Sequence, residues 1–210
     1  MANGFVSFDS KNGLLHVAGQ TFKLTETREG DRYDSVDQAS GLMTAGTELV
    51  LFRDLANKNT QDTSFKTARR VPQGEEFVIS RIGAVLAQTH GGTMVSDDDI
   101  IKLAYAGVLE IKVNTRIVWD APIVFSPAGY GVTGMTNRTD TGVVTNGVAS
   151  YAASPNLLVP QVVTGNDDID GRIHFPNNSW LGGGAVLPTL DGRCKMMAIL
   201  HGIIKQGLGR

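Results

Sequence analysis

The segment VLEIKVNTRIVWDAPIVFSP, residues 108–127, constrains the fold of this chain more than any other. β-Branched and aromatic residues alternate with other residues on both sides of Asn114-Thr115, which has the length of a hairpin turn. We expect two paired strands with one face buried and the other mostly wet. Trp119 alternates with Ile117, so we expect Trp119 to lie in the core.

Similar short apolar runs recur along the chain between clusters of Gly, Asn, Asp, Thr and Pro, a spacing typical of β-sandwiches and β-barrels. About ten strands fit that spacing. The 210 residues fall within the ~200 to 250 that such folds use as one domain, so we predict a single β-sandwich domain over residues 1–210. Two polar stretches, Thr25–Thr44 and Pro127–Gly147, are interpreted as long loop excursions at the surface.

Three further segments carry specific expectations. Phe5–Phe8 and Leu14–Ala18 are predicted to pair as an N-terminal hairpin, because a Lys-Asn-Gly turn signal stands between them. Ser96–Asp99 precede an apolar pattern that begins at Ile100, which predicts one short helix with its carboxylates at the positive end of the dipole. The almost continuous apolar run Cys194–Ile204 predicts a central strand covered on both faces.

Charge and cysteine content exclude several classes of protein. Nineteen basic and 21 acidic side chains give a net charge of −2, and Lys11 and Lys23 are the only fixed cations among the first 25 residues. A basic arm for nucleic acid is therefore absent, and we expect no direct contact with nucleic acid. Cys194 is the only cysteine, so an intramolecular disulfide cannot form. No stretch approaches the ~20 apolar residues of a membrane span, and we expect a soluble chain.

One acidic segment imitates the start of a calcium-binding loop. Asn166, Asp168 and Asp170 place oxygen atoms at alternate positions, and Gly171 follows them. The twelfth position of that pattern is Asn177, whereas a tight loop uses a bidentate glutamate there. These three residues are a weak calcium candidate, and an acidic surface turn is the competing interpretation.

Signals for catalysis are missing from the sequence. There is no Gly-x-Ser-x-Gly elbow, and the Gly182–Gly184 run lacks the Lys and Ser/Thr of a phosphate loop. The four histidines, His16, His90, His174 and His201, stand tens of residues apart, so no metal-binding pair is visible. We predict no catalytic residue, no cofactor and no enzyme activity, although a site assembled from distant residues would escape this reasoning.

Four segments give the chain a resemblance to a known family. They are the strand Val108–Val113, the pair Ala121-Pro122, the turn Ser126–Gly131 and the apolar closing strand Met196–Ile204. In style and order these elements resemble the jelly-roll coat proteins of tailless icosahedral bacteriophages. The resemblance extends loosely from Thr47 to the C-terminus and leaves the first 46 residues unassigned.

That resemblance implies a jelly-roll β-sandwich in which eight core strands form two sheets. It also implies a virion structural protein, a capsid subunit that self-assembles into an icosahedral shell, often over a membrane, after synthesis in the host cytoplasm. The expected partners are other copies of the chain and other virion proteins. The alternative is a β-sandwich module that binds host glycans or a receptor through Tyr130 and its Gly-rich loop.

Overall fold

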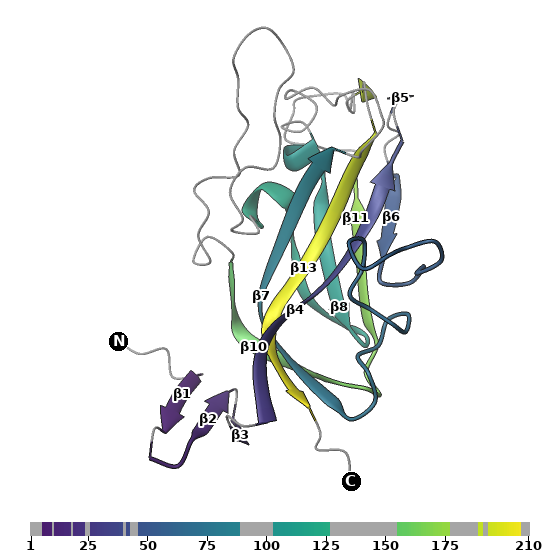
Figure 1. The fold of residues 1–210 in the computed structure, drawn as a ribbon. Coiled ribbons are helices and arrows are strands. Elements are labelled where there is room, and N and C mark those ends of the chain that lie inside the picture. The colour runs from purple at the N-terminus through teal and green to yellow at the C-terminus, as the bar shows by residue number, and fades with distance from the viewer. Residues whose placement is uncertain are drawn as a thin grey trace, which may run out of the picture.

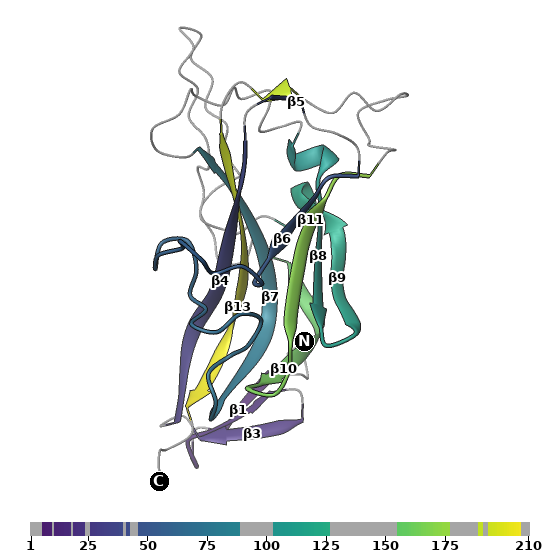
Figure 2. The ribbon, with the colours of Figure 1, turned by 90° about the vertical axis from the view of Figure 1, so that its right-hand side faces the viewer.

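A computed structural model describes residues 6–9, 11–17, 19–23, 26–39, 41–42, 46–88, 103–126, 155–176, 189–190 and 193–206. Strands dominate these ranges and pair antiparallel, so the predicted all-β fold is confirmed. The two largest sheets are four-stranded and face each other as two layers (Figure 1 and Figure 2).

The first sheet has the strand order β10-β7-β13-β4 and the second has the order β6-β11-β8-β9. The strands of the first sheet are β10 (Asn156–Thr164), β7 (Glu75–Gln88), β13 (Cys194–Gln206) and β4 (Thr27–Gln38). Those of the second sheet are β6 (Glu48–Leu51), β11 (Ile169–His174), β8 (Val108–Val113) and β9 (Arg116–Pro122). A short 3-10 turn, η2 (Ile123–Phe125), follows β9.

Two small sheets accompany the sandwich. β1 (Val6–Asp9), β2 (Leu14–Val17) and β3 (Gln20–Lys23) form a three-stranded sheet, which confirms the predicted N-terminal hairpin. Phe22 of β3 is buried against Val78 of β7, so the small sheet rests on the outward face of the first sheet. β5 (Gly41–Leu42) pairs with β12 (Thr189–Leu190).

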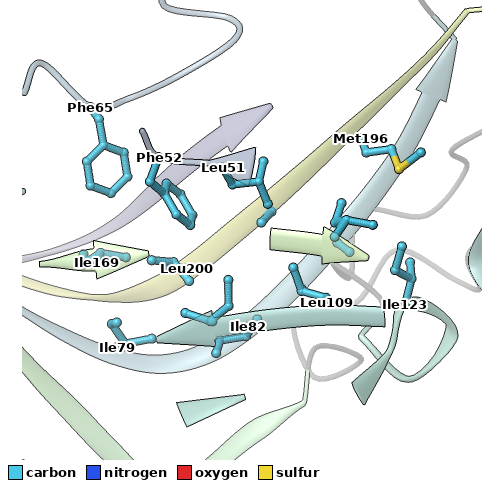
Figure 3. Packing of buried hydrophobic residues seen from close by; sticks show 14 of the residues in the cluster. Leu51, Phe52, Phe65, Ile79, Ile82, Leu109, Ile123, Ile169, Met196 and Leu200 are labelled. Atoms are coloured by element: carbon cyan, nitrogen blue, oxygen red, sulfur yellow. The ribbon is translucent and has the colours of Figure 1, made fainter. Parts of the chain in front are cut away.

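The core lies between the two four-stranded sheets and is built from hydrophobic side chains, Met196 among them (Figure 3). Each sheet contributes side chains that are fully or nearly fully buried. From the first sheet come Phe77, Ile79, Ile82, Met196 and Leu200, and from the second come Leu51, Leu109, Ile111, Ile169 and Ile173. Successive side chains of a strand point to opposite faces of its sheet, so the inward-pointing side chains of the two sheets fill the space between them.

β13 is the central strand that the apolar C-terminal run predicted. It pairs with β4 along one side and with β7 along the other. Met196 and Leu200 belong to the core cluster, while Ile199 and His201, at alternate positions, are also buried. Both faces of the strand are therefore covered, as expected from its continuous hydrophobicity.

The predicted surface connection at 25–44 is wrong over most of its length. Residues 27–38 form β4, which pairs with β13 from Thr27 to Gln38. Its charges resemble a solvated run in the sequence, but several have partners in the structure: Arg32 pairs with Glu75, Asp34 with Lys58 and Asp37 with Arg193. An edge strand can carry such charges because only one of its flanks is paired.

The β8–β9 hairpin forms as predicted, with Asn114 in the left-handed region at φ 56°. The side chains of β9 that face the core, however, differ from those that strict alternation predicts. Trp119 pairs with Ile111 and packs against the core, whereas Ile117 pairs with Lys112. The extra residue between them is a β-bulge, and it leaves Ile117 49% exposed instead of on Trp119's buried side.

Two predictions concern residues outside the described ranges. Pro127–Gly147 lies outside them, as do Ser96–Asp99, the start of the predicted helix. Residues 103–106, at the end of that pattern, are helical. No helix within the described ranges is long and apolar enough to cross a membrane.

Gly202 on β13 provides a test of this packing. A Cβ at Gly202 would lie 1.9 Å from the carbonyl oxygen of Val78 on β7, and backbone cannot move aside as a side chain can. We expect Gly202→Ala to lower the free energy of unfolding by at least about 2 kcal/mol in a urea titration. Gly30 on β4 pairs with Gly202 on β13. A Cβ added at Gly30 would closely approach only the flexible end of the Ile204 side chain, at 2.7 Å. Gly30→Ala should cost less, and equal losses would contradict the register.

Candidate functional site

The sandwich has two long sides on which an edge strand of one sheet lies beside an edge strand of the other. β4 and β6 are the edges on one side, and we call this side the first seam. β9 and β10 are the edges on the other, and we call it the second seam. Unpaired sheet edges are where one chain most readily joins another, so both seams are candidate interaction surfaces.

The first seam is closed by the segment between β6 and β7. The amide of Ser64 donates to the carbonyl of Tyr33 on β4 at 2.9 Å, and the amide of Tyr33 donates to the Ser64 hydroxyl at 2.8 Å. Thr63 forms an isolated bridge with Asp34. Lys195 also reaches this segment through an ion pair with Asp62. At Tyr33 and Asp34 the open flank of β4 is thus occupied by the chain itself.

A fully buried carboxylate anchors this closing segment. Asp34, 0% exposed, accepts the amide of Phe52 at 2.6 Å and both of its oxygens accept the ammonium of Lys58 at 2.8 Å. Phe52 holds φ 65°, in the left-handed region, and its ring lies 5.0 Å from that of Phe65 in the core. A buried charge is tolerated only with such partners, so these contacts fix the path of the chain at the seam.

The weak calcium candidate lies at and beyond the turn between β10 and β11, beside three arginines. Asp168 accepts Nε of Arg70 at 3.0 Å, with Arg69 at 3.6 Å. Asp170 accepts Arg53 at 2.6 and 3.0 Å, and these bonds raise the pKa of Arg53. Asn166 is exposed. In the part of the chain that the structure describes, no cluster of three His, Cys, Asp or Glu side chains could hold a metal ion. Guanidinium groups compete for these carboxylates, and the calcium site stays a prediction.

Asp167, in the same turn, connects it to the β8–β9 turn. Its carboxylate accepts the side-chain amide of Asn114 at 2.9 Å and the backbone amide and hydroxyl of Thr164 at 2.8 and 2.7 Å. These bonds favour the ionised form and lower the pKa of Asp167. Asn114 in return accepts the amide of Asp168 at 3.0 Å.

Charged side chains form a ladder on the outward face of the second sheet. Arg172 on β11 donates to Glu48 on β6 at 2.5 Å and to Glu110 on β8 at 2.8 and 3.2 Å. Lys112 adds an ion pair with Glu110 at 2.8 Å. Burial would raise the pKa of Glu110, but the bonds from Arg172 and Lys112 outweigh it and lower the pKa. The ladder lines a hollow of about 110 Å³ whose charges already neutralise one another, so it stiffens the face and offers no free ionic site.

The second seam is open and apolar. β9 and β10 together line a groove of about 410 Å³. Its lining residues are Arg116, Ile117, Val118, Trp119, Asn156, Leu157, Leu158, Val159 and Gln161. Ile117, Leu158 and Val159 are 49%, 87% and 48% exposed, which is costly for aliphatic side chains in water.

Irregular pairing explains why these side chains are exposed. β9 carries the bulge beside Ile117, and the pairing of β10 with β7 shifts register between Asn156 and Gln161. Ile117 in β9 and Leu158 and Val159 in β10 are exposed at these irregular stretches, whereas Val118 and Leu157 still pack against the core. Charge is scarce here as well, because Arg116 is the only charged residue of the lining.

The other candidates from the sequence fall in different places. His16 contacts the Thr21 hydroxyl at 2.8 Å on the small N-terminal sheet, and buried His201 contacts Asp31 at 2.8 Å across β13 and β4. Trp119 donates its indole N–H to Ser126 at 2.9 Å. Tyr130, the residue behind the alternative glycan-binding hypothesis, lies outside the described ranges, as does His90. The structure does not bring the histidines of the described ranges to a common site.

No family model matches this chain, and no curated protein matches it either.

The closing segment of the first seam should depend on the charge of Lys58. Lys58→Met leaves the buried carboxylate of Asp34 without its cation, and we expect a loss of roughly 3 kcal/mol in the free energy of unfolding by urea titration. The double variant with Asp34→Asn removes both charges and should recover part of that loss. A double variant at least as unstable as Lys58→Met would contradict the role of this pair.

The turn at Asp167 should respond to acid. Because the folded state lowers the pKa of Asp167, its stabilisation is present above the unfolded value of about 3.9 and is lost as the pH falls through the folded value. Asp167→Asn should cost about 1 kcal/mol at neutral pH, and the difference from wild type should shrink below about pH 4. Asp120→Asn, at an exposed strand position, is the control. A cost that is unchanged in acid would exclude the ionic contribution.

Proposed function

We propose that this chain is a jelly-roll coat subunit of an icosahedral virus and that its activity is self-assembly into a shell. A jelly roll is an antiparallel hairpin of eight strands that wraps into two sheets. In such a hairpin the first strand pairs with the eighth, the second with the seventh, the third with the sixth and the fourth with the fifth.

The strand pairing is the observation that carries this proposal. Counting the strands of the two large sheets in chain order gives β4, β6, β7, β8, β9, β10, β11 and β13. The pairs β4–β13, β6–β11, β7–β10 and β8–β9 are all present. The two remaining neighbours, β13–β7 and β11–β8, are those that wrapping adds. The complete nested set supports the jelly-roll topology over other eight-stranded sandwiches.

The fold alone does not select the function, since jelly rolls also serve lectins and cupins. The second seam favours a subunit over a solitary protein. Three exposed aliphatic side chains beside an apolar groove form a surface that gains from contact with another chain. Other virion proteins and a membrane beneath the shell are the further partners that the resemblance to bacteriophage coat proteins implies, and the virion is the proposed location.

Self-assembly is tested on the purified full-length chain. Analytical ultracentrifugation with electron microscopy, from low to high protein concentration and from low to molar salt, should reveal discrete species many times the 22.4 kDa of one chain. Bovine serum albumin under the same conditions controls for crowding artefacts. A chain that remains monomeric throughout would contradict the proposal.

A further inference from the structure

We infer that the second seam is a contact between two copies of this chain, in which Leu158 of each copy enters the β9–β10 groove of the other. The inference rests on the self-assembly proposed above and adds to it the surface and the partner. It follows from the charge, the shape and the size of the seam.

The charge distribution of the four sheet edges favours self-contact at β10. Its sequence, NLLVPQVVT, contains no charged residue, whereas β9 carries Arg116 and Asp120, and β6 carries Glu48. β4 is half charged, with Arg28, Glu29, Asp31, Arg32, Asp34 and Asp37 among its 12 residues. Like charges that face each other across a contact are destabilising, and β10 is the edge strand that carries no charge to oppose a second copy of itself.

The shape of the seam makes it self-complementary. Leu158, 87% exposed, projects from the same surface that contains the groove of about 410 Å³. In a two-fold contact each copy offers the same projection and the same groove. Leu158 of the first copy can therefore fill the groove of the second, while Leu158 of the second fills the groove of the first. Arg116, the single cation of the lining, is the first residue of β9 and contributes one charge per copy.

The contact should use side chains more than a continued sheet. Pro160 has no amide hydrogen to donate, and the register shift between Asn156 and Gln161 bends the strand there. These features oppose simple edge-to-edge pairing but leave Leu158 and Val159 free to dock. A stable interface buries about 800 Å² per partner, so Ile117, Leu158 and Val159 would form its apolar centre within a wider polar rim.

A charge placed in the groove tests the inference. Leu158→Lys should weaken self-association of the full-length chain at least ~10-fold by sedimentation equilibrium, because it places two like charges in an apolar contact. At dilutions where the chain is monomeric its thermal midpoint should stay unchanged, since the side chain is already exposed. Val50→Lys is the matched control: Val50 is 38% exposed on the edge strand β6, outside the groove. It should associate like the wild type.

A cross-linking measurement identifies the occupant directly. Cys194 is buried and is the only cysteine, so Leu158→Cys adds the single accessible thiol of the described residues. With a short bismaleimide, this variant should form covalent dimers at associating concentrations, while Val50→Cys should not. In dilute monomer the thiol should react freely with a maleimide dye.

Three outcomes would overturn the inference, and they are distinguishable. If the wild type associates, but Leu158→Lys associates as tightly and Leu158→Cys forms no cross-link, the shell proposal stands and the second seam is not the interface. If the dilute Leu158→Cys thiol is protected, the chain's own residues fill the groove. If the wild type never associates, the proposed function fails first.

Discussion

The first sheet depends on β13, because this strand joins β4 to β7. It pairs with β4 from residue 194 to 205 and with β7 from 194 to 206. These two strand pairings also position neighbouring elements: β10 pairs on the far side of β7, and the small N-terminal sheet rests on Val78 and Ile203. The second sheet packs on the same strands through the core. The chain cannot complete its core until its last strand arrives, and folding that depends on such distant pairings is slow.

The two seams resolve the exposed edges of the sandwich in opposite ways. At the first, the segment between β6 and β7 bonds to β4 at Tyr33 and Asp34 and is held by the buried Asp34–Lys58 contact. At the second, bulged strands present aliphatic side chains to solvent. A protein that works alone gains from closing both seams, whereas a subunit needs one surface that is completed by a neighbour. The asymmetry is therefore the physical link between this fold and the proposed role in assembly.

The elements of the fold that could be predicted from the sequence are those whose pattern lies within a few neighbouring residues. The N-terminal hairpin, the β8–β9 hairpin and the apolar strand β13 were all predicted, since period and turn residues lie within a few positions of each other. β4 was missed because its carboxylates and guanidinium groups resemble a solvated run, and their partners Lys58, Glu75 and Arg193 are distant in sequence. The groove was missed because a bulge changes the face of Ile117 without changing the pattern, and because β10 joins the site from 40 residues away.

Hydrogen–deuterium exchange on dilute and concentrated samples tests both the role of β13 in the fold and the role of the second seam in self-association. We expect the β13 amides to exchange slowest at all concentrations, and residues 116–122 and 156–164 to gain protection only on association. β13 exchanging as fast as the termini would contradict the fold. Equal exchange of the two seam strands in dilute and associated samples would contradict the assembly surface.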